Sequence, residues 1–329
     1  MWQYILRRFT YMIFTVWIIS LITFAVIQLP PGDYVSTMVS QMINSGMDEL
    51  PPDFEQEVRA QYGLDQPIYV QYYKWMRNII RDGEFGYSWI YRRDAKDIMV
   101  ERLPASFAIS AFSVLFIWMI ALPIGIYSAV KQYSLADYTF TLIGFIGLAV
   151  PNFLFALILL FISYKYMDQA MIGLYSQKYE TAPWSLAKFW DLVKHLWIPV
   201  VIIGTSGTAG LIRTMRANLL DELNKPYVDT ARSKGLSETT LLWRYPVRHA
   251  LNPFISTIGW ILPSLIAGEL IVSIVLNLPT SGPVIFNSLM DQDMYVAAGF
   301  ILILSTLTVL GTFISDLMLA LLDPRIRLS

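Results

Sequence analysis

The chain has 329 residues, of which 55% are hydrophobic and only 15% are charged. Soluble domains carry about 25% charged residues, so this balance excludes an ordinary soluble protein and predicts an all-α polytopic membrane protein. With a net charge of −1 and no basic patch, nothing indicates nucleic-acid binding. The absence of cysteine excludes disulfides and thiol chemistry. Because the only histidines, His195 and His249, lack ligand spacing, we predict no metal site. The sequence also suggests no catalytic triad and no cofactor.

The first apolar run follows two basic residues, Arg7 and Arg8, and extends over residues 12–29. It is too long for a typical signal-peptide core, and no small-residue cleavage site follows it. We therefore predict that residues 1–30 form an uncleaved first transmembrane helix whose N-terminus lies in the cytoplasm.

Residues 31–103 are polar and are predicted to form a long extracytoplasmic loop with two short helices. Residues 52–62 open with prolines and acids, which favour a helix N-terminus. Residues 67–81 place large side chains on one helical face: Ile68, Tyr72, Trp75, Met76 and Ile79. We favour packing of this face against the spans or lipid headgroups; the alternative is a surface that receives a substrate-binding protein.

Residues 104–329 contain five further apolar runs, which predict a five-helix core: 105–130, 138–164, 196–220, 254–276 and 296–322. The second span is expected to kink at Pro123, and the third contains Pro151. In the fourth span three glycines favour close helix packing: Gly204, Gly207 and Gly210. Near its end, Arg213 and Arg216 are expected to extend to the membrane interface.

Six spans would place both termini on one side of the membrane. The short loop 277–295 carries no lysine or arginine, whereas the termini and the segment 225–250 are basic. Short loops follow the rule that positive charge stays in the cytoplasm. We therefore predict a cell-membrane protein with both termini and the segment 225–250 in the cytoplasm.

The segment 225–250 is the longest polar run in the C-terminal half of the chain. It predicts two short helices at an angle, residues 227–234 and a second from Ser237 to Arg244, separated by Gly235. Glycine supplies the left-handed backbone that ends a helix, and serine is a good N-cap. The plain alternative is an ordinary cytoplasmic loop.

This segment resembles the EAA motif of ABC-importer permeases. Asp229-Thr230-Ala231 is followed after three residues by Gly235, with Asp in place of Glu and Thr in place of the first Ala. In that family the loop couples the permease to its ATPase, and Ala231 is small enough for a partner surface to approach its helix. The resemblance implies a coupling site made of six residues: Asp229, Thr230, Ala231, Lys234, Gly235 and Leu236. The family's downstream Ile-x-Leu-Pro element is not cleanly present.

The stretches YILRRF, LPPGD, TARSKGLSE, RHALNP and the final Asp-Pro-Arg are similar to the dipeptide/oligopeptide (Dpp/Opp) branch, from Tyr4 to Arg327. The resemblance implies the type I ABC-importer permease fold with six transmembrane helices in the lipid bilayer. It also implies a second homologous permease subunit, two ATP-binding subunits and an extracytoplasmic substrate-binding protein. The implied substrates are peptides, with oligosaccharides or a nickel chelate as alternatives. No Walker A sequence is present, so ATP hydrolysis belongs to the partners.

The clearest ionisable residue within a predicted span is Glu269. A charge at membrane depth costs about 2.5–3.5 kcal/mol on insertion scales, so it faces either a helix partner or a cavity; both interpretations stay open. In many Dpp/Opp relatives the acid of this segment falls one turn later, where this chain has Ser273. We expect the fifth span, with Asn252 at its start, to line the translocation pathway.

Two other classes are less compatible with the sequence. A membrane-embedded enzyme needs clustered catalytic groups in its spans, and a secondary transporter shows inverted repeats with ionisable pairs at the midplane. Neither pattern is visible.

Overall fold

The computed structural model describes residues 2–28, 35–36, 39, 42–43, 51, 53–62, 65–88, 90–167, 172–252, 254 and 270–322. Within these residues the chain is almost wholly helical, with one two-stranded sheet. It forms two compact units, which are described separately. Unit 1 comprises Met1–Arg8, Phe107–Pro279 and Leu310–Ser329, and unit 2 comprises Phe9–Ser106 and Thr280–Val309.

Four described helices are long and apolar enough to cross a membrane: α1 (Trp2–Ile27), α5 (Ala95–Val130), α8 (Leu186–Leu223) and α14 (Met294–Leu322). A fifth span is present if α6 (Leu135–Ala149) and α7 (Asn152–Met167) are counted together. Most of the span expected at 254–276 lies outside the described residues. The polytopic helical class is therefore confirmed, whereas the count of six spans stays a prediction.

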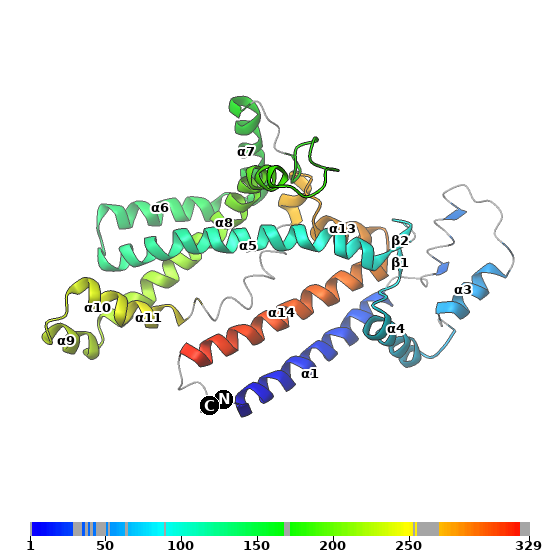
Figure 1. The fold of residues 1–329 in the computed structure, drawn as a ribbon, viewed down its shortest axis with the longest axis horizontal. Coiled ribbons are helices and arrows are strands. Elements are labelled where there is room, and N and C mark those ends of the chain that lie inside the picture. Colours follow the sequence, from blue (N-terminus) through cyan, green and yellow to red (C-terminus); the bar gives the residue numbers. More distant parts are fainter. Residues whose placement is uncertain are drawn as a thin grey trace. The chain divides into compact units, whose positions relative to one another are not determined.

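The third predicted span is interrupted. Helix α6 ends at Ala149, Val150 adopts an extended backbone (φ −81°, ψ 120°), and α7 continues at an angle of 100° to α6. The cause is Pro151, because proline disfavours the helical conformation in the preceding residue and has no N–H to continue the hydrogen bonds. The structure thus replaces one helix with a broken span or a re-entrant pair (Figure 1).

Helix α5 begins at Ala95, so the boundary expected at residues 103–104 lies inside a helix. Its 36 residues extend over about 54 Å at 1.5 Å per residue, more than the ~30 Å core of a bilayer. The additional turns are stabilised because Ala95, Ile98 and Met99 are buried with Val296 and Phe300 of α14 in one apolar cluster. Burial of these residues therefore stabilises the part of the helix that precedes the expected boundary.

Unit 2 contains both short helices predicted in the polar segment, α3 (Phe54–Tyr62) and α4 (Ile68–Asp82). Helix α4 ends at Gly83, which adopts a left-handed backbone with φ 68°. An antiparallel hairpin follows, in which β1 (Tyr87–Ser88) pairs with β2 (Arg93–Asp94).

The predicted apolar face of α4 packs within unit 2. Trp75 is buried beside Phe24 of α1 and Tyr295 of α14, and three further α4 residues pack against the same cluster: Tyr72, Met76 and Ile79. The packing interpretation is confirmed for these four side chains. Ile68, at the start of the helix, is instead 61% exposed.

Asp293, which precedes the first residue of α14, connects that helix to the hairpin. Its carboxylate accepts a hydrogen bond from the hydroxyl of Ser88 on β1, and its backbone carbonyl accepts one from Ala297. Burial raises the pKa of Asp293 to about 6, and the nearby Asp291 also raises it. This end of α14 therefore holds a carboxyl group that binds its proton more tightly than a free aspartate does.

In unit 1, glycines allow helices to pack closely against α8. A Cβ atom on Gly204 would lie 2.4 Å from the ring of Phe116 on α5, and one on Gly207 would lie 2.8 Å from Ile117. On α6, a Cβ on Gly147 would lie 2.7 Å from Thr205. The close approach predicted for the fourth span is thus observed for Gly204 and Gly207.

Candidate functional site

Three short helices follow α8 and form a compact group at its end: α9 (Pro226–Ser233), α10 (Glu238–Arg244) and α11 (Pro246–Ala250) (Figure 1). We call this group the knob. Pro226 and Pro246 occupy the first turns of α9 and α11, where a missing N–H costs no helical hydrogen bond. The sequence predicted the first two helices but not α11.

The turn between α9 and α10 has the predicted conformation. Gly235 adopts φ 79°, and a Cβ atom built there would meet nothing within 4 Å. Ser237 occupies the N-cap position of α10, although its hydroxyl contacts the hydroxyl of Thr240 and not a backbone N–H. Glycine is therefore favoured at this position by its left-handed backbone conformation, and not by a lack of space for a side chain.

The knob has its own small apolar core. Val228, Ala231 and Leu241 are buried, with Leu236 partly buried against them. Ala231 is only 8% exposed, so its side chain faces the core of the knob. The methyl group is therefore covered by the chain itself, and the close approach of a partner surface to its helix stays a prediction.

The remaining motif residues face outward. Asp229, Thr230, Lys234 and Gly235 are exposed. Arg232 contacts Asp229 on its own helix at 3.3 Å and Glu238 of α10 at 2.6 Å. The hydrogen bond with Arg232 lowers the pKa of the Glu238 carboxyl. The ion pair between Arg232 and Glu238 therefore connects α9 to α10 across the turn. Asp229 and Lys234 remain exposed to solvent beside it.

The knob is joined to α8 by both polar and apolar contacts. The hydroxyl of Tyr227 donates a hydrogen bond to Glu222 Oε2 at 2.5 Å, and Lys225 Nζ contacts Glu222 Oε1 at 2.5 Å. Burial and the Glu222 carboxylate raise the pKa of Tyr227. Further along α8, Met215 and Leu219 are buried against α11. The role of Glu222 was not predicted from the sequence; its spacing of three residues from Lys225 was the available signal.

The predicted pathway residues are only partly described. Asn252 is half-buried after α11, and Ser273 is fully buried, with its carbonyl accepting a hydrogen bond from Leu278 N at 2.8 Å. Glu269 lies outside the described residues. The structure therefore does not test whether these three residues share one surface.

The expectation that Arg213 and Arg216 extend to the membrane interface stays a prediction. The guanidinium of Arg216 forms an ion pair with Asp137, in the first turn of α6. Arg213, by contrast, lies over the ring of Phe145, with 5.5 Å from its guanidinium carbon to the ring centroid.

Two family models together match nearly the whole chain. Residues 1–110 match the N-terminal component, and residues 121–328 match the main component, of "Binding-protein-dependent transport system inner membrane component". The chain belongs to this family. It is therefore a multi-pass inner-membrane permease subunit of an ABC importer, a transport component that operates with ATP-binding subunits and a substrate-binding protein.

Individual relatives place this permease within the dipeptide/oligopeptide group. It is 34% identical to the oligopeptide transport system permease protein AppB of Bacillus subtilis (strain 168) over 98% of this chain and 99% of that protein. It is 27% identical to the dipeptide transport system permease protein DppB of Escherichia coli (strain K12), over 99% of both chains.

Among solved structures, the inward-facing MetNI methionine ABC transporter matches with a TM-score of 0.52 and 15% identity. The match covers 69% of this chain and 96% of that chain. At this identity the likeness shows the fold alone, and it confirms the type I importer permease fold.

Proposed function

We propose that this permease is one of two homologous transmembrane subunits that form a pathway for short peptides. The observation that carries the proposal is the full-length likeness to AppB and DppB, whose names specify oligopeptides and dipeptides. A heterodimer in the lipid bilayer, two ATP-binding subunits and an extracytoplasmic binding protein complete the importer. Oligosaccharides and a nickel chelate are the competing substrate classes.

The proposed topology places both termini and the knob in the cytoplasm. Residues 1–30 form the first span, residues 31–103 face the outside, and residues 104–329 form the core with the coupling segment 225–250. The support is the distribution of lysine and arginine over the short loops.

In this arrangement the knob contacts an ATP-binding subunit. The proposed contact surface comprises the exposed motif residues Asp229, Thr230, Lys234 and Gly235, with Leu236 at its edge. Ala231 acts from inside, by packing α9 on α10. Because Glu222, Tyr227 and the α8–α11 contacts join the knob to a span, a displacement of the knob is passed to α8.

The proposed pathway wall is the fifth span. Asn252 marks its start, and Glu269 and Ser273 are four residues apart in the sequence, a spacing that would place them on one face of a helix. A carboxyl group at membrane depth is costly unless it faces a partner or a cavity, which supports Glu269 as a pathway residue.

The decisive test is uptake by the complete importer in proteoliposomes. Radiolabelled peptides of two to five residues should accumulate only when the second permease, both ATPases, the binding protein and ATP are present. Preference for a labelled oligosaccharide or nickel chelate would overturn the peptide assignment. Uptake by this chain without ATPase subunits would overturn the importer assignment.

The topology is tested with an impermeant thiol reagent, which the cysteine-free chain permits. Cysteines placed at the exposed residues Asp53 and Asp82 should be labelled in intact cells. A cysteine at the exposed Lys234 should be labelled only after lysis. Labelling of position 234 in intact cells, with positions 53 and 82 labelled only after lysis, would show that the topology is the reverse of the proposed one.

A further inference from the structure

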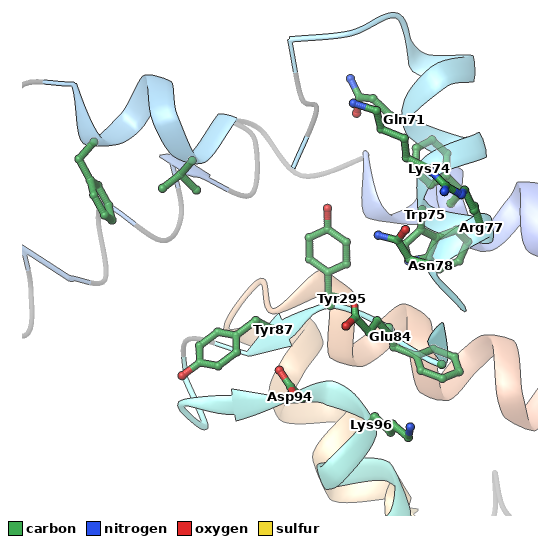
Figure 2. Close-up of a pocket in the computed structure, with 16 residues that line it drawn as sticks. Gln71, Lys74, Trp75, Arg77, Asn78, Glu84, Tyr87, Asp94, Lys96 and Tyr295 are labelled. Carbon is green, nitrogen blue, oxygen red and sulfur yellow. The ribbon is translucent and has the colours of Figure 1, made fainter. Parts of the chain in front are cut away.

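Unit 2 holds a pocket of about 710 Å³ that the transport role described above does not use. Residues of α1, α3 and α4, the hairpin, the first turn of α5 and Tyr295 of α14 line it (Figure 2). Pockets that bind small molecules usually measure about 300–1,000 Å³ and combine apolar walls with a few polar groups. This pocket has a volume in that range, and both apolar and polar side chains line it.

The aromatic part of the pocket is fixed in position. Gly86 has φ 115°, and a Cβ atom built there would lie 2.7 Å from the ring of Tyr295, so the hairpin backbone lies directly against that ring. Trp75 is 7% exposed, and its indole Nε1 is buried without a hydrogen-bond partner in the part of the chain that the structure describes. A buried donor without a partner is costly, and here it belongs to a residue that lines the pocket.

Charged side chains of both signs line the pocket. Lys74 and Arg77 project from α4, whereas Glu84 and Asp94 lie across the pocket on the hairpin side (Figure 2). Lys96 of α5 adds a third cation beside the hairpin. Among the described residues, none of these five side chains forms an ion pair, and all five are exposed. Their charges are therefore available to a ligand.

We propose that this pocket binds short peptides in their zwitterionic form. The peptide carboxylate contacts Lys74 and Arg77, the ammonium group contacts Glu84 and Asp94, and an apolar side chain packs on Trp75 and Tyr295. A simple anion would not need the acidic side chains, and a neutral sugar would need neither the acidic nor the basic ones. The inference rests on the proposed function for its ligand class, and it adds a binding site on the permease itself.

The test uses the full chain in lipid nanodiscs and the peptide Ala-Phe-Ala, with binding measured by saturation-transfer NMR. Exposed ion pairs contribute up to about 1 kcal/mol, which corresponds to about fivefold in Kd. N-acetylation and C-amidation should therefore each weaken binding by about fivefold.

Single substitutions should each weaken the effect of one of these two terminal modifications. Arg77→Gln should reduce the effect of C-amidation, because Lys74 remains, and leave the effect of N-acetylation unchanged. Glu84→Gln should reduce the effect of N-acetylation, because Asp94 remains, and leave the effect of C-amidation unchanged. Arg81→Gln is the matched control, because Arg81 is exposed on the same helix but does not line the pocket. It should bind all three peptides as the unaltered chain does.

Absence of saturable peptide binding, or identical responses of Arg77→Gln and Arg81→Gln, would overturn the inference. So would variants that bind the peptide normally and lose only affinity for the substrate-binding protein, since the pocket would then be a protein contact. Uptake by the complete importer separates the two proposals. Peptide uptake without binding here overturns this inference alone, whereas an importer that rejects peptides overturns the proposed function.

Discussion

The guanidinium of Arg216 on α8 contacts both carboxylate oxygens of Asp137 on α6, with Nε to Oδ1 at 3.1 Å and Nη2 to Oδ2 at 3.0 Å. Asp137 also accepts a hydrogen bond from the backbone N–H of Tyr133, at 3.0 Å. The Asp137 side chain is 4% exposed and that of Arg216 is 28% exposed. This two-point contact holds the loop between α5 and α6 against α8.

Asp137→Asn should destabilise unit 1, because it leaves a partly buried guanidinium without its counter-charge. Removing one partner of a buried pair typically costs about 3 kcal/mol or more. Thermal unfolding in detergent micelles measures the loss. Asp229→Asn is the control, since its pair with Arg232 is exposed and should contribute less than about 1 kcal/mol. Equal melting of the two variants would contradict the structural role of the pair.

Gly235→Val should impair coupling, whereas Gly235→Asn should retain most of it. The position has open space but requires φ 79°, which asparagine tolerates and a β-branched residue does not. The strain of about 1–3 kcal/mol would change the angle between α9 and α10. ATPase co-purification, stimulated ATP hydrolysis and peptide uptake should all decline for valine. Wild-type values for valine would show that the turn does not transmit motion.

Ala231→Trp and Thr230→Trp should fail in different ways. Ala231 is buried against Leu241, so a large side chain there disrupts the core of the knob and should expose it to limited proteolysis. Thr230 is exposed, so its tryptophan should leave the protease resistance unchanged and still displace the ATPase. If Thr230→Trp binds the ATPase normally, the docking surface lies elsewhere on the knob.

Asp293→Asn should flatten the pH dependence of stability. The pKa of Asp293 rises from 3.8 to about 6 on folding, so its stabilising contribution is complete below about pH 4 and is lost as the pH rises through 6. Between pH 4 and 7 the unaltered chain should lose about 2 kcal/mol relative to the variant. Melting curves at both pH values measure this difference. Asp82→Asn, at an exposed carboxyl, should follow the unaltered chain.

Glu269→Gln should alter transport without affecting assembly, because it keeps the shape of the side chain and removes its charge. Uptake, substrate range and pH dependence should be compared in proteoliposomes that contain equal amounts of complex. If all three are unchanged, Glu269 has a structural role. Ser273→Ala, at a fully buried hydroxyl, is a useful companion variant.

The sequence predicted features that depend on neighbouring residues. Gly235 imposes a left-handed backbone locally, so the end of α9 was correctly placed, whereas α11, which begins at Pro246, was missed. Hydropathy likewise located four membrane helices, α1, α5, α8 and α14, although not the early start of α5. The inward orientation of Ala231 was not predictable, because it depends on Leu241 of the next helix.

Features that depend on residues far apart in the chain were not predicted from the sequence. Asp137 and Arg216 are 79 residues apart, and Ser88 and Asp293 are 205 residues apart. The early start of α5 depends on burial of Ile98 and Met99 against α14. No periodicity or spacing signals such contacts, since they exist only once the helices have packed.

The interruption at Pro151 has a consequence for hydration. Proline cannot donate a hydrogen bond, so the carbonyl of Gly147, four residues earlier, loses its helical donor. In hydrocarbon an unsatisfied carbonyl costs several kcal/mol, so the junction of α6 and α7 should lie where water can reach it. A spin label at Val150 should therefore report high accessibility to a water-soluble relaxation agent, even though apolar helices flank it on both sides.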